Sequence, residues 1–209
     1  GSNTIEANAR MCMTSAVTAY FKTLGSDTPP LAYEDIELSD MVLHFGHNAR
    51  ESHPIIFWRI ADHKKKTGIP TVVVDPRYTG TAEGYRQIKG VNSIHVPILN
   101  GDISFLNAIA HVLLKEHPDI IDWDFLKANT KGWEEYTDGV LKDYSPEQVQ
   151  DRMGGPNHQV PPELIRRVAS MFAGATRKRL ERRKAGDEKG GVIIMWGIGY
   201  NQHIHGQHN

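Results

Sequence analysis

The run Thr71-Val72-Val73-Val74, followed by Asp75-Pro76-Arg77, decides the fold class of this chain. The first four residues are β-branched and carry no charge, so both faces of the strand that they predict are expected to be covered. Strands buried on both faces are typical of parallel sheets, because crossover helices lie on the two sides. Pro76 is suited to a turn after the strand. This stretch therefore predicts an α/β protein.

Strand and helix patterns alternate on both sides of Thr71–Val74. Short apolar runs at Met41–Phe45 and near Ile94–Val96 predict two further strands. Helices are expected between and after these strands, beginning at Pro54, covering Ala82 to Gln87, and beginning at Asp102. The alternation predicts a parallel sheet with crossover helices on both faces, in a Rossmann-like arrangement.

The pattern divides the chain into five regions. An N-terminal helix is expected from Met11 to about Leu24, and Gly25 ends it. A strand is expected again at Gly191–Trp196. In order, the regions are residues 1–40 with the N-terminal helix and a link, 41–117 with the α/β region, 118–175 with a helical segment, 176–190 with a charged insertion, and 191–209 with the returning strand and a loop.

Composition excludes several classes of protein. The 24 basic and 25 acidic residues nearly cancel, so no overall charge favours nucleic acid or an anionic membrane. The charged stretch Arg177–Lys189 mixes both signs without aromatic residues, which is typical of solvated surface and not of a nucleic-acid interface. Apolar runs are too short for a membrane span. Neither end resembles a natural terminus, so we expect a piece of a longer polypeptide.

Polar residues follow the first two strands, where parallel sheets bind their ligands. Gly46 allows a phosphate to approach the backbone, and Asn48 offers hydrogen bonds beside the next helix, although this is not the G-x-G-x-x-G fingerprint. After the second strand, Asp75 is placed to bind a ribose hydroxyl or a guanine edge and Arg77 to bind a phosphate. A proline turn with a surface ion pair explains the same residues equally well.

The third and fourth strands end in further candidate residues. Asn100-Gly101-Asp102 follows the third strand, and Asp102 by itself is best explained as the cap of the next helix. Its carboxylate has a second possible role, because carboxylates accept the paired N–H donors of a base such as guanine. After the last strand, Gln202 is within reach of a ligand bound at this edge.

Cys12 is the only cysteine of the chain. It has no partner for a disulfide or for a zinc or iron–sulfur site, but its thiolate suits a soft metal whose other ligands belong to a cofactor. It precedes an apolar run, so we expect it near a helix N-terminus, which lowers the pKa of a thiol. On chemistry alone, a small buried hydrophobe is the more common role.

The histidines do not point to a metal centre. His203, His205 and His208 have a spacing that zinc sites use, but a zinc site is disfavoured because its ligands need a fixed geometry. His44, His47 and His53 are interpreted as separate strand and loop histidines rather than as one cluster.

Taken together, these segments resemble the molybdopterin oxidoreductases that carry bis-molybdopterin guanine dinucleotide, with the bacterial nitrate reductase branch, assimilatory or periplasmic, as the best match. The resemblance runs from Asn3 to about Gly206. The matching landmarks are Asn8-Ala9-Arg10-Met11-Cys12-Met13-Thr14-Ser15-Ala16-Val17, Tyr33-Glu34-Asp35-Ile36-Glu37, Gly46-x-Asn48-x-x-Glu51-x-His53-Pro54-Ile55, Val74-Asp75-Pro76-Arg77 and Trp196-x-x-Gly199-x-Asn201-Gln202.

The resemblance implies a function for these residues. Cys12 is similar to the family's thiolate ligand of molybdenum, and Met13 falls next to it in the substrate pocket. The positions matching the family's contacts to the two pterin dinucleotides are Asn8, Gly46, Asn48, Glu51, Asp75, Arg77, Asn100, Gly101, Asp102, Ile198 and Gln202. The implied reaction is reduction of nitrate to nitrite by oxygen-atom transfer, with nitrate as the small-molecule substrate.

The resemblance also implies parts that this chain lacks. The family places a [4Fe–4S] cluster on a cysteine-rich segment before this region, and it closes the cofactor site with later segments. The chain is therefore expected to be a fragment that is inactive alone. The intact parent would receive electrons from a ferredoxin, flavoprotein or cytochrome. A cytoplasmic location is expected, with a periplasmic one as the alternative.

Some residues depart from the family's pattern, and other functions stay open. His47 and Arg50 stand where small or apolar residues are common, Ile198 replaces a common Met, and Asn100-Gly101-Asp102 replaces a Gly-Thr-Asp or Gln-Ser-Asp form. The alternatives are another molybdopterin oxidoreductase such as a formate dehydrogenase, a nicotinamide enzyme of the plain Rossmann class, and a non-catalytic nucleotide-binding fragment. Formate enzymes usually have a histidine after the cysteine or selenocysteine, whereas Met13 follows Cys12 here.

Overall fold

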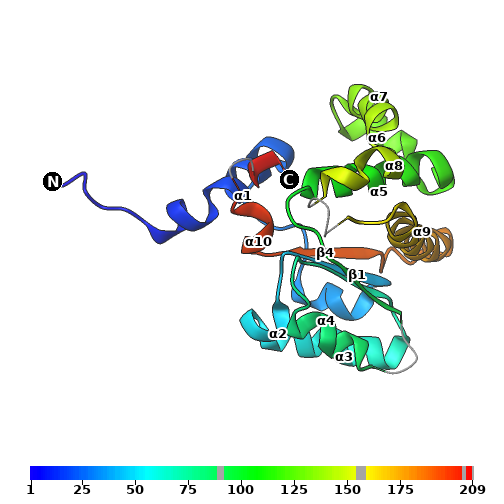
Figure 1. Ribbon diagram of the computed structural model, residues 1–209, viewed down its shortest axis with the longest axis horizontal. Helices are drawn as coiled ribbons and strands as arrows, with labels where there is room; N and C mark the ends of the chain where they lie inside the picture. Colours follow the sequence, from blue (N-terminus) through cyan, green and yellow to red (C-terminus); the bar gives the residue numbers. More distant parts are fainter. Residues whose placement is uncertain (89–91, 154–158, 204–205, 209) are drawn as a thin grey trace.

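A computed structural model describes residues 1–88, 92–153, 159–203 and 206–208. Its centre is a parallel sheet with the strand order β3-β2-β1-β4 (Figure 1). The strands are β1 (Met41–Phe45), β2 (Thr71–Val74), β3 (Ser93–Val96) and β4 (Val192–Trp196). All pairings are parallel, so the predicted α/β class is confirmed.

The strand register brings the carboxyl ends of all four strands to one edge. Phe45 at the end of β1 pairs with Val74 of β2 and with Trp196 of β4. Val74 pairs in turn with Val96 at the end of β3. The four loops that follow these strands therefore begin side by side, which is the arrangement in which open α/β sheets bind ligands.

Helices cover both faces of the sheet (Figure 1). One face packs against α5 (Asp102–Glu116) and α9 (Pro162–Lys184), and the other against α3 (Pro54–Thr67) and α4 (Gly80–Arg86). Side chains alternate between the two cores, with Val72 and Val74 on the first side and Val73 on the second. All four residues of β2 are buried, as its uncharged β-branched sequence predicted.

Local signals account for most helix boundaries. Pro54 occupies the first turn of α3, where its missing N–H costs nothing. Gly25 ends α1 (Asn8–Leu24) in the left-handed region with φ of 74°, and its N–H donates to the Phe21 carbonyl. Gly68 ends α3 in the same way, with φ of 74°. A short helix, α2 (Ala49–Ser52), precedes α3.

Residues 118–153 are mostly short helices, as predicted for the helical segment. These are η2 (Pro118–Ile120), α6 (Trp123–Asn129), α7 (Trp133–Asp143), α8 (Pro146–Val149) and η3 (Gln150–Arg152). The remaining short elements are η1 (Tyr33–Leu38) before the sheet, and α10 (Ile198–Asn201) and η4 (Gly206–His208) after it. Within the described residues, no helix combines the length and the apolar character needed to cross a membrane.

The charged stretch is partly helical. Helix α9 continues to Lys184, so the first half of the expected insertion is its last turns. Several of its basic residues make tertiary contacts: Arg177 Nε lies 2.7 Å from Asp119 Oδ2, and Arg182 pairs with Asp40, the residue before β1. The end of α9 is therefore attached to the neighbouring elements, because its arginines meet carboxylates that come from distant parts of the chain.

Candidate functional site

The turn after β1 is packed tightly against the turn after β4. Gly46 has φ of 55°, in the region that favours glycine. A Cβ at this position would lie 2.6 Å from the Tyr200 nitrogen and 2.7 Å from the Gly199 carbonyl carbon. A Cβ on Gly197 would in turn meet the Gly46 carbonyl oxygen at 2.6 Å. The two backbones approach this closely only because both turns carry glycine.

A cavity of about 170 Å³ opens at this edge of the sheet. It is smaller than the pockets of roughly 300–1,000 Å³ that enclose whole drug-sized ligands, so it suits one end of a dinucleotide. Five of the predicted site residues line it together with residues from all four strand ends. The lining residues are Gly46, Val74, Asp75, Pro76, Arg77, Ile98, Leu99, Asn100, Asp102, Gly199 and His203.

The residues after β2 combine a turn with an exposed cation. Asp75 is 7% exposed, and its Oδ1 accepts a hydrogen bond of 2.9 Å from the Arg77 backbone N–H. The Arg77 guanidinium lies 3.9 Å from the same carboxylate and extends into solvent, with 78% of its side chain exposed. The proline turn is therefore present, and it leaves the charge of Arg77 available at the rim of the cavity.

Asp102 does not cap its helix, so the role that the sequence by itself favoured is wrong. Gly101 is the cap residue of α5, and no side chain caps that end. Gly101 has φ of 131° and packs so closely on η3 that a Cβ would lie 2.7 Å from the Arg152 carbonyl oxygen. Gly101 therefore takes the cap position, and Asp102 is the first residue of the helix. The Asp102 side chain turns toward the cavity instead.

The Asp102 carboxylate is an available acceptor in a partly dry environment. Its side chain is 14% exposed, and Oδ2 lies 3.8 Å from His203 Nε2. Burial raises the pKa of Asp102, while the charge of His203 acts in the opposite direction. His203 was not predicted at this cavity. The only signal in the sequence was its place one residue after Gln202, in the loop that follows β4.

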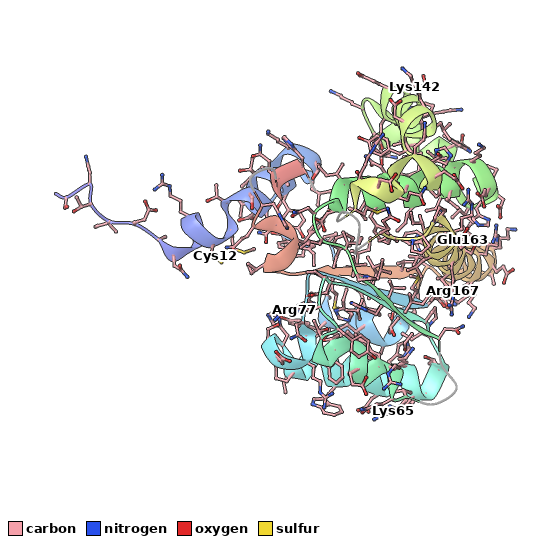
Figure 2. The ribbon with its side chains drawn as sticks, in the orientation of Figure 1. Cys12, Lys65, Arg77, Lys142, Glu163 and Arg167 are labelled. Atoms are coloured by element: carbon pink, nitrogen blue, oxygen red, sulfur yellow. The ribbon has the colours of Figure 1, made fainter. Side chains whose placement is uncertain are left out.

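Cys12 lies within α1, in a part that contacts the same edge of the sheet. Helix α1 starts at Asn8, three residues before the predicted start, so Cys12 is its fifth residue and not its second. Cys12 and Met13 are half-buried. The Gln202 amide Nε2 donates a 3.3 Å hydrogen bond to the Cys12 carbonyl oxygen. Cys12 and Arg77 lie toward the same end of the molecule in Figure 2.

The Cys12 thiol therefore does not lie at the helix N-terminus, where the sequence had led us to expect it. The influence of the helix dipole falls off within the first turn, and Cys12 comes after it. Contact with α10 places Cys12 instead: the Ser15 hydroxyl donates a 2.8 Å hydrogen bond to the Asn201 carbonyl. Asn201 is 2% exposed, and its side-chain Oδ1 has no hydrogen-bond partner within the described part of the chain. A buried acceptor without a donor is costly unless something else supplies one.

The remaining predicted residues are not gathered at the cavity. Asn48 Oδ1 accepts a 2.8 Å hydrogen bond from the Thr81 hydroxyl, which ties α2 to α4. Glu51 is exposed and faces Gly80. Asn8 is exposed at the first position of α1, and Ile198 is 41% exposed on α10.

Three histidines that were interpreted as separate form one row with Tyr85, in which His44 and His47 are buried and His53 is exposed. His44 Nε2 lies 3.0 Å from the Tyr85 hydroxyl, and His44 Nδ1 lies 3.1 Å from His47 Nδ1. His47 Nε2 lies 2.9 Å from His53 Nδ1. Burial lowers the pKa of His44 to about 3 and that of His47 to about 4, so these two histidines are neutral at pH 7. Only the turn at Gly46 brings His47 back over β1, which sequence spacing does not reveal.

Among the described residues, no three histidine, cysteine or acidic side chains are grouped as metal ligands. His205, one of the three histidines with zinc-like spacing, lies outside the described residues. His203 faces Asp102 across the cavity, as above.

A family model described as "Molybdopterin oxidoreductase" matches residues 1–209. The chain belongs to the molybdopterin oxidoreductase family. Membership confirms the family that the motifs indicated, and this family implies a molybdenum–pterin cofactor.

The curated relatives include enzymes of two kinds, nitrate reductases and formate dehydrogenases. A nitrate reductase of Synechocystis sp. is 35% identical over 208 residues, which cover 99% of this chain and 25% of the relative. Formate dehydrogenase H of Escherichia coli is 30% identical over 207 residues, covering 99% of this chain and 25% of the relative. The chain thus spans about a quarter of the length of these relatives. Similarity alone does not separate the two kinds.

A solved structure has the same fold. Acetylene hydratase from Pelobacter acetylenicus superposes with a TM-score of 0.69 at 22% identity, over 96% of this chain and 23% of that protein. At this identity the match shows the fold and not the reaction. It agrees with the parallel sheet and its two helical layers (Figure 1).

Proposed function

We propose that this chain is the part of a molybdenum-dependent nitrate reductase that holds bis-molybdopterin guanine dinucleotide. The observation that carries the proposal is the meeting of two features at one edge of the sheet. A cavity lined by Asp75, Arg77 and Asp102 lies there, and Gln202 links the same edge to the helix that carries Cys12. The residues fit the cofactor, because the cavity offers the carboxylates of Asp75 and Asp102 as acceptors for a base and the guanidinium of Arg77 as a cation for phosphate.

Each residue has a chemical role in this proposal. The Cys12 thiolate is the protein ligand of the metal, and Met13 adjoins the space for nitrate. Arg77 binds phosphate oxygens, and Asp102 or Asp75 accepts the N–H donors of guanine. When bound, the cofactor supplies two-electron oxygen-atom transfer. The protein positions it, and a [4Fe–4S] cluster and an electron donor would belong to the remainder of the parent.

Formate oxidation is the second candidate, because formate dehydrogenases are as similar to this chain as nitrate reductases are. The α subunit of an F420-dependent formate dehydrogenase of Methanococcus maripaludis is 35% identical over 175 residues. The methionine at position 13 favours nitrate. The full-length parent should reduce nitrate with a reduced viologen dye as electron donor and should leave formate unoxidised. Formate turnover without nitrate turnover would replace the first candidate by the second.

Replacing Cys12 by alanine in the full-length parent is expected to abolish nitrate turnover. The variant removes the proposed thiolate ligand, so the metal would lose its one bond to the protein. Turnover and molybdenum content per protein, by elemental analysis, are the measurements. Thr14→Ala changes an exposed position on the same helix and is expected to behave as the wild type. Survival of both molybdenum loading and turnover in the Cys12 variant would show that the ligand is misassigned.

Replacing Asp102 by asparagine is expected to weaken binding of GDP to this chain by about 10- to 100-fold. A carboxylate accepts two guanine N–H donors, and an amide presents one acceptor and loses the charge, which removes roughly 1.5–3 kcal/mol. Calorimetric titration with GDP and ADP measures the effect. The preference of the wild type for GDP should disappear in the variant, whereas Asp138→Asn, at an exposed position on α7, should retain it. Equal binding of ADP and GDP by the wild type would contradict the guanine assignment.

A further inference from the structure

The row formed by Tyr85, His44, His47 and His53 connects four elements beside the candidate site. Tyr85 comes from α4, His44 from β1, His47 from the turn after β1, and His53 from the junction of α2 and α3. Along the row from Tyr85 to His53, the three successive contacts between side-chain polar atoms are 3.0, 3.1 and 2.9 Å long. Tyr85 and His44 are fully buried, and His47 is 6% exposed. The row joins the turn at the cavity to the helices on one face of the sheet.

Every link of the row can be made with His44 and His47 both neutral. A neutral imidazole has one donor and one acceptor, and both His44 and His47 have both nitrogens in contact with a neighbour in the row. All links are satisfied when the donors point in one direction along the row. A proton added to His47 would make both of its nitrogens donors and would place a charge in a buried position. Such a charge is costly when no opposite charge accompanies it.

Among the described residues, no acidic side chain faces His47 to balance a positive charge on its imidazole. The titratable side chains that face it are His44 from β1, His53 at the start of α3, and Tyr20 and Tyr33 across a groove beside β4. Arg50 and Glu51, on α2, face Gly80 of α4 instead. Within the described residues, none of the ion pairs includes His44, His47 or His53.

His47 also lies at the contact between the two glycine turns. It directly follows Gly46, which lines the cavity, and a Cβ on Gly197 would lie 3.0 Å from the His47 Cα. Any movement of His47 therefore changes how the turn after β1 meets the turn after β4. Because Gly199 of the second turn also lines the cavity, the cavity shape depends on this contact.

We propose that His47 is a positioning residue for the nucleotide cavity. When His47 is neutral, its hydrogen bonds in the row hold the Gly46–Asn48 turn in the position that forms the cavity. At acidic pH a second state is favoured, in which the turn has left this position and the His47 imidazole is charged and solvated. The inference rests on the proposed function of the cavity. Because the released turn binds a proton more readily, the ratio of released to held turn rises by up to about tenfold for each pH unit below the ordinary pKa of an imidazole.

Binding of GDP to this chain between pH 7.5 and 5.5 tests the proposal. The wild type is expected to bind about two- to fourfold more weakly at pH 5.5, while circular dichroism shows that it stays folded. His47→Gln keeps one donor and one acceptor but does not titrate, so it should bind like the wild type at pH 7.5 and lose the pH dependence. His47→Leu should bind weakly at both pH values. His63→Gln changes a buried histidine near the opposite edge of the sheet, where it bonds to the Ser39 carbonyl, and should retain the wild-type profile.

Two results would overturn the proposal: a pH dependence in His47→Gln equal to that of the wild type, or wild-type affinity in His47→Leu. Nuclear magnetic resonance of the wild type gives a second measurement that needs no variant. The Gly46 and Asn48 amide signals should shift with the His47 ring signals as the pH falls. If the wild type fails to bind GDP at pH 7.5, the proposed nucleotide function is wrong, and the coupling of these signals still decides whether His47 positions the turn.

Discussion

Acidification from pH 7 to pH 5 is expected to lower the free energy of unfolding of this chain by about 2–4 kcal/mol. Burial lowers the pKa of His44 to about 3 and of His47 to about 4, against an ordinary value of 6.5. Below pH 6.5 the unfolded chain therefore binds protons that the folded chain does not. The stability that the neutral histidines retain is complete above pH 6.5 and decreases as the pH falls toward 4.

The titration of carboxylates does not hide the loss of stability that the two histidines cause between pH 6.5 and pH 5. Arginine hydrogen bonds lower the pKa of Glu37, Asp119 and Glu147, so their contributions decrease only at more acidic pH. Burial raises the pKa of Asp102, which favours folding on acidification and opposes the trend by one group. Two histidines against one carboxyl group leave a net loss of stability between pH 6.5 and pH 5.

Urea unfolding at a series of pH values measures this effect. The double variant His44→Leu and His47→Ser removes both groups, so its stability should change much less between pH 6.5 and pH 5, whatever its stability at pH 7. His63→Gln alters a histidine outside the row and should keep the wild-type dependence. The same steep dependence in the double variant would show that other groups are responsible.

Replacing Gly46 by alanine is expected to destabilise the chain by about 2–5 kcal/mol. The φ of 55° strains any residue with a Cβ, and that Cβ would lie 2.6 Å from the Tyr200 nitrogen. The obstructing atoms are backbone atoms of α10, which do not rotate away as a flexible side chain would. The turn after β4 must move, so GDP binding at the cavity should weaken together with stability.

Gly68 provides the matched control for this variant. It also has a left-handed φ, of 74°, but a Cβ there would have no atom within 4 Å. Gly68→Ala is therefore expected to cost only the backbone strain, about 1–2 kcal/mol, and to leave GDP binding unchanged. Equal losses of stability in the two variants would mean that the contact between the turns does not restrict residue 46.

Local sequence signals predicted the sheet and most helix boundaries well. The β-branched run at Thr71–Val74 indicated a strand buried on both faces, and it lies between β1 and β3. Gly25, Gly68 and Pro54 act through their own backbone conformations, which depend little on distant residues. Such signals are reliable because cause and effect lie within a few residues.

The predictions that failed depended on contacts between distant segments. Asp102 looked like a helix cap, but Gly101, which packs on Arg152, is the cap of α5, and Asp102 is the first residue of the helix. Cys12 looked like a residue of the first turn of a helix, but α1 begins at Asn8. In both places, the local sequence allows two starting points, and tertiary packing selects one.

The sequence by itself determined the parallel α/β sheet, the residues at its strand ends and the family, because these depend on short-range patterns and on ordered motifs. Only the tertiary structure decided that Asp102 faces His203 across a cavity, that Gln202 bonds to the Cys12 backbone, and that three histidines form one row. The physical reason is the same in each case. The partners lie on different elements, and the turns between those elements set their distance, so sequence spacing carries no information about the contact.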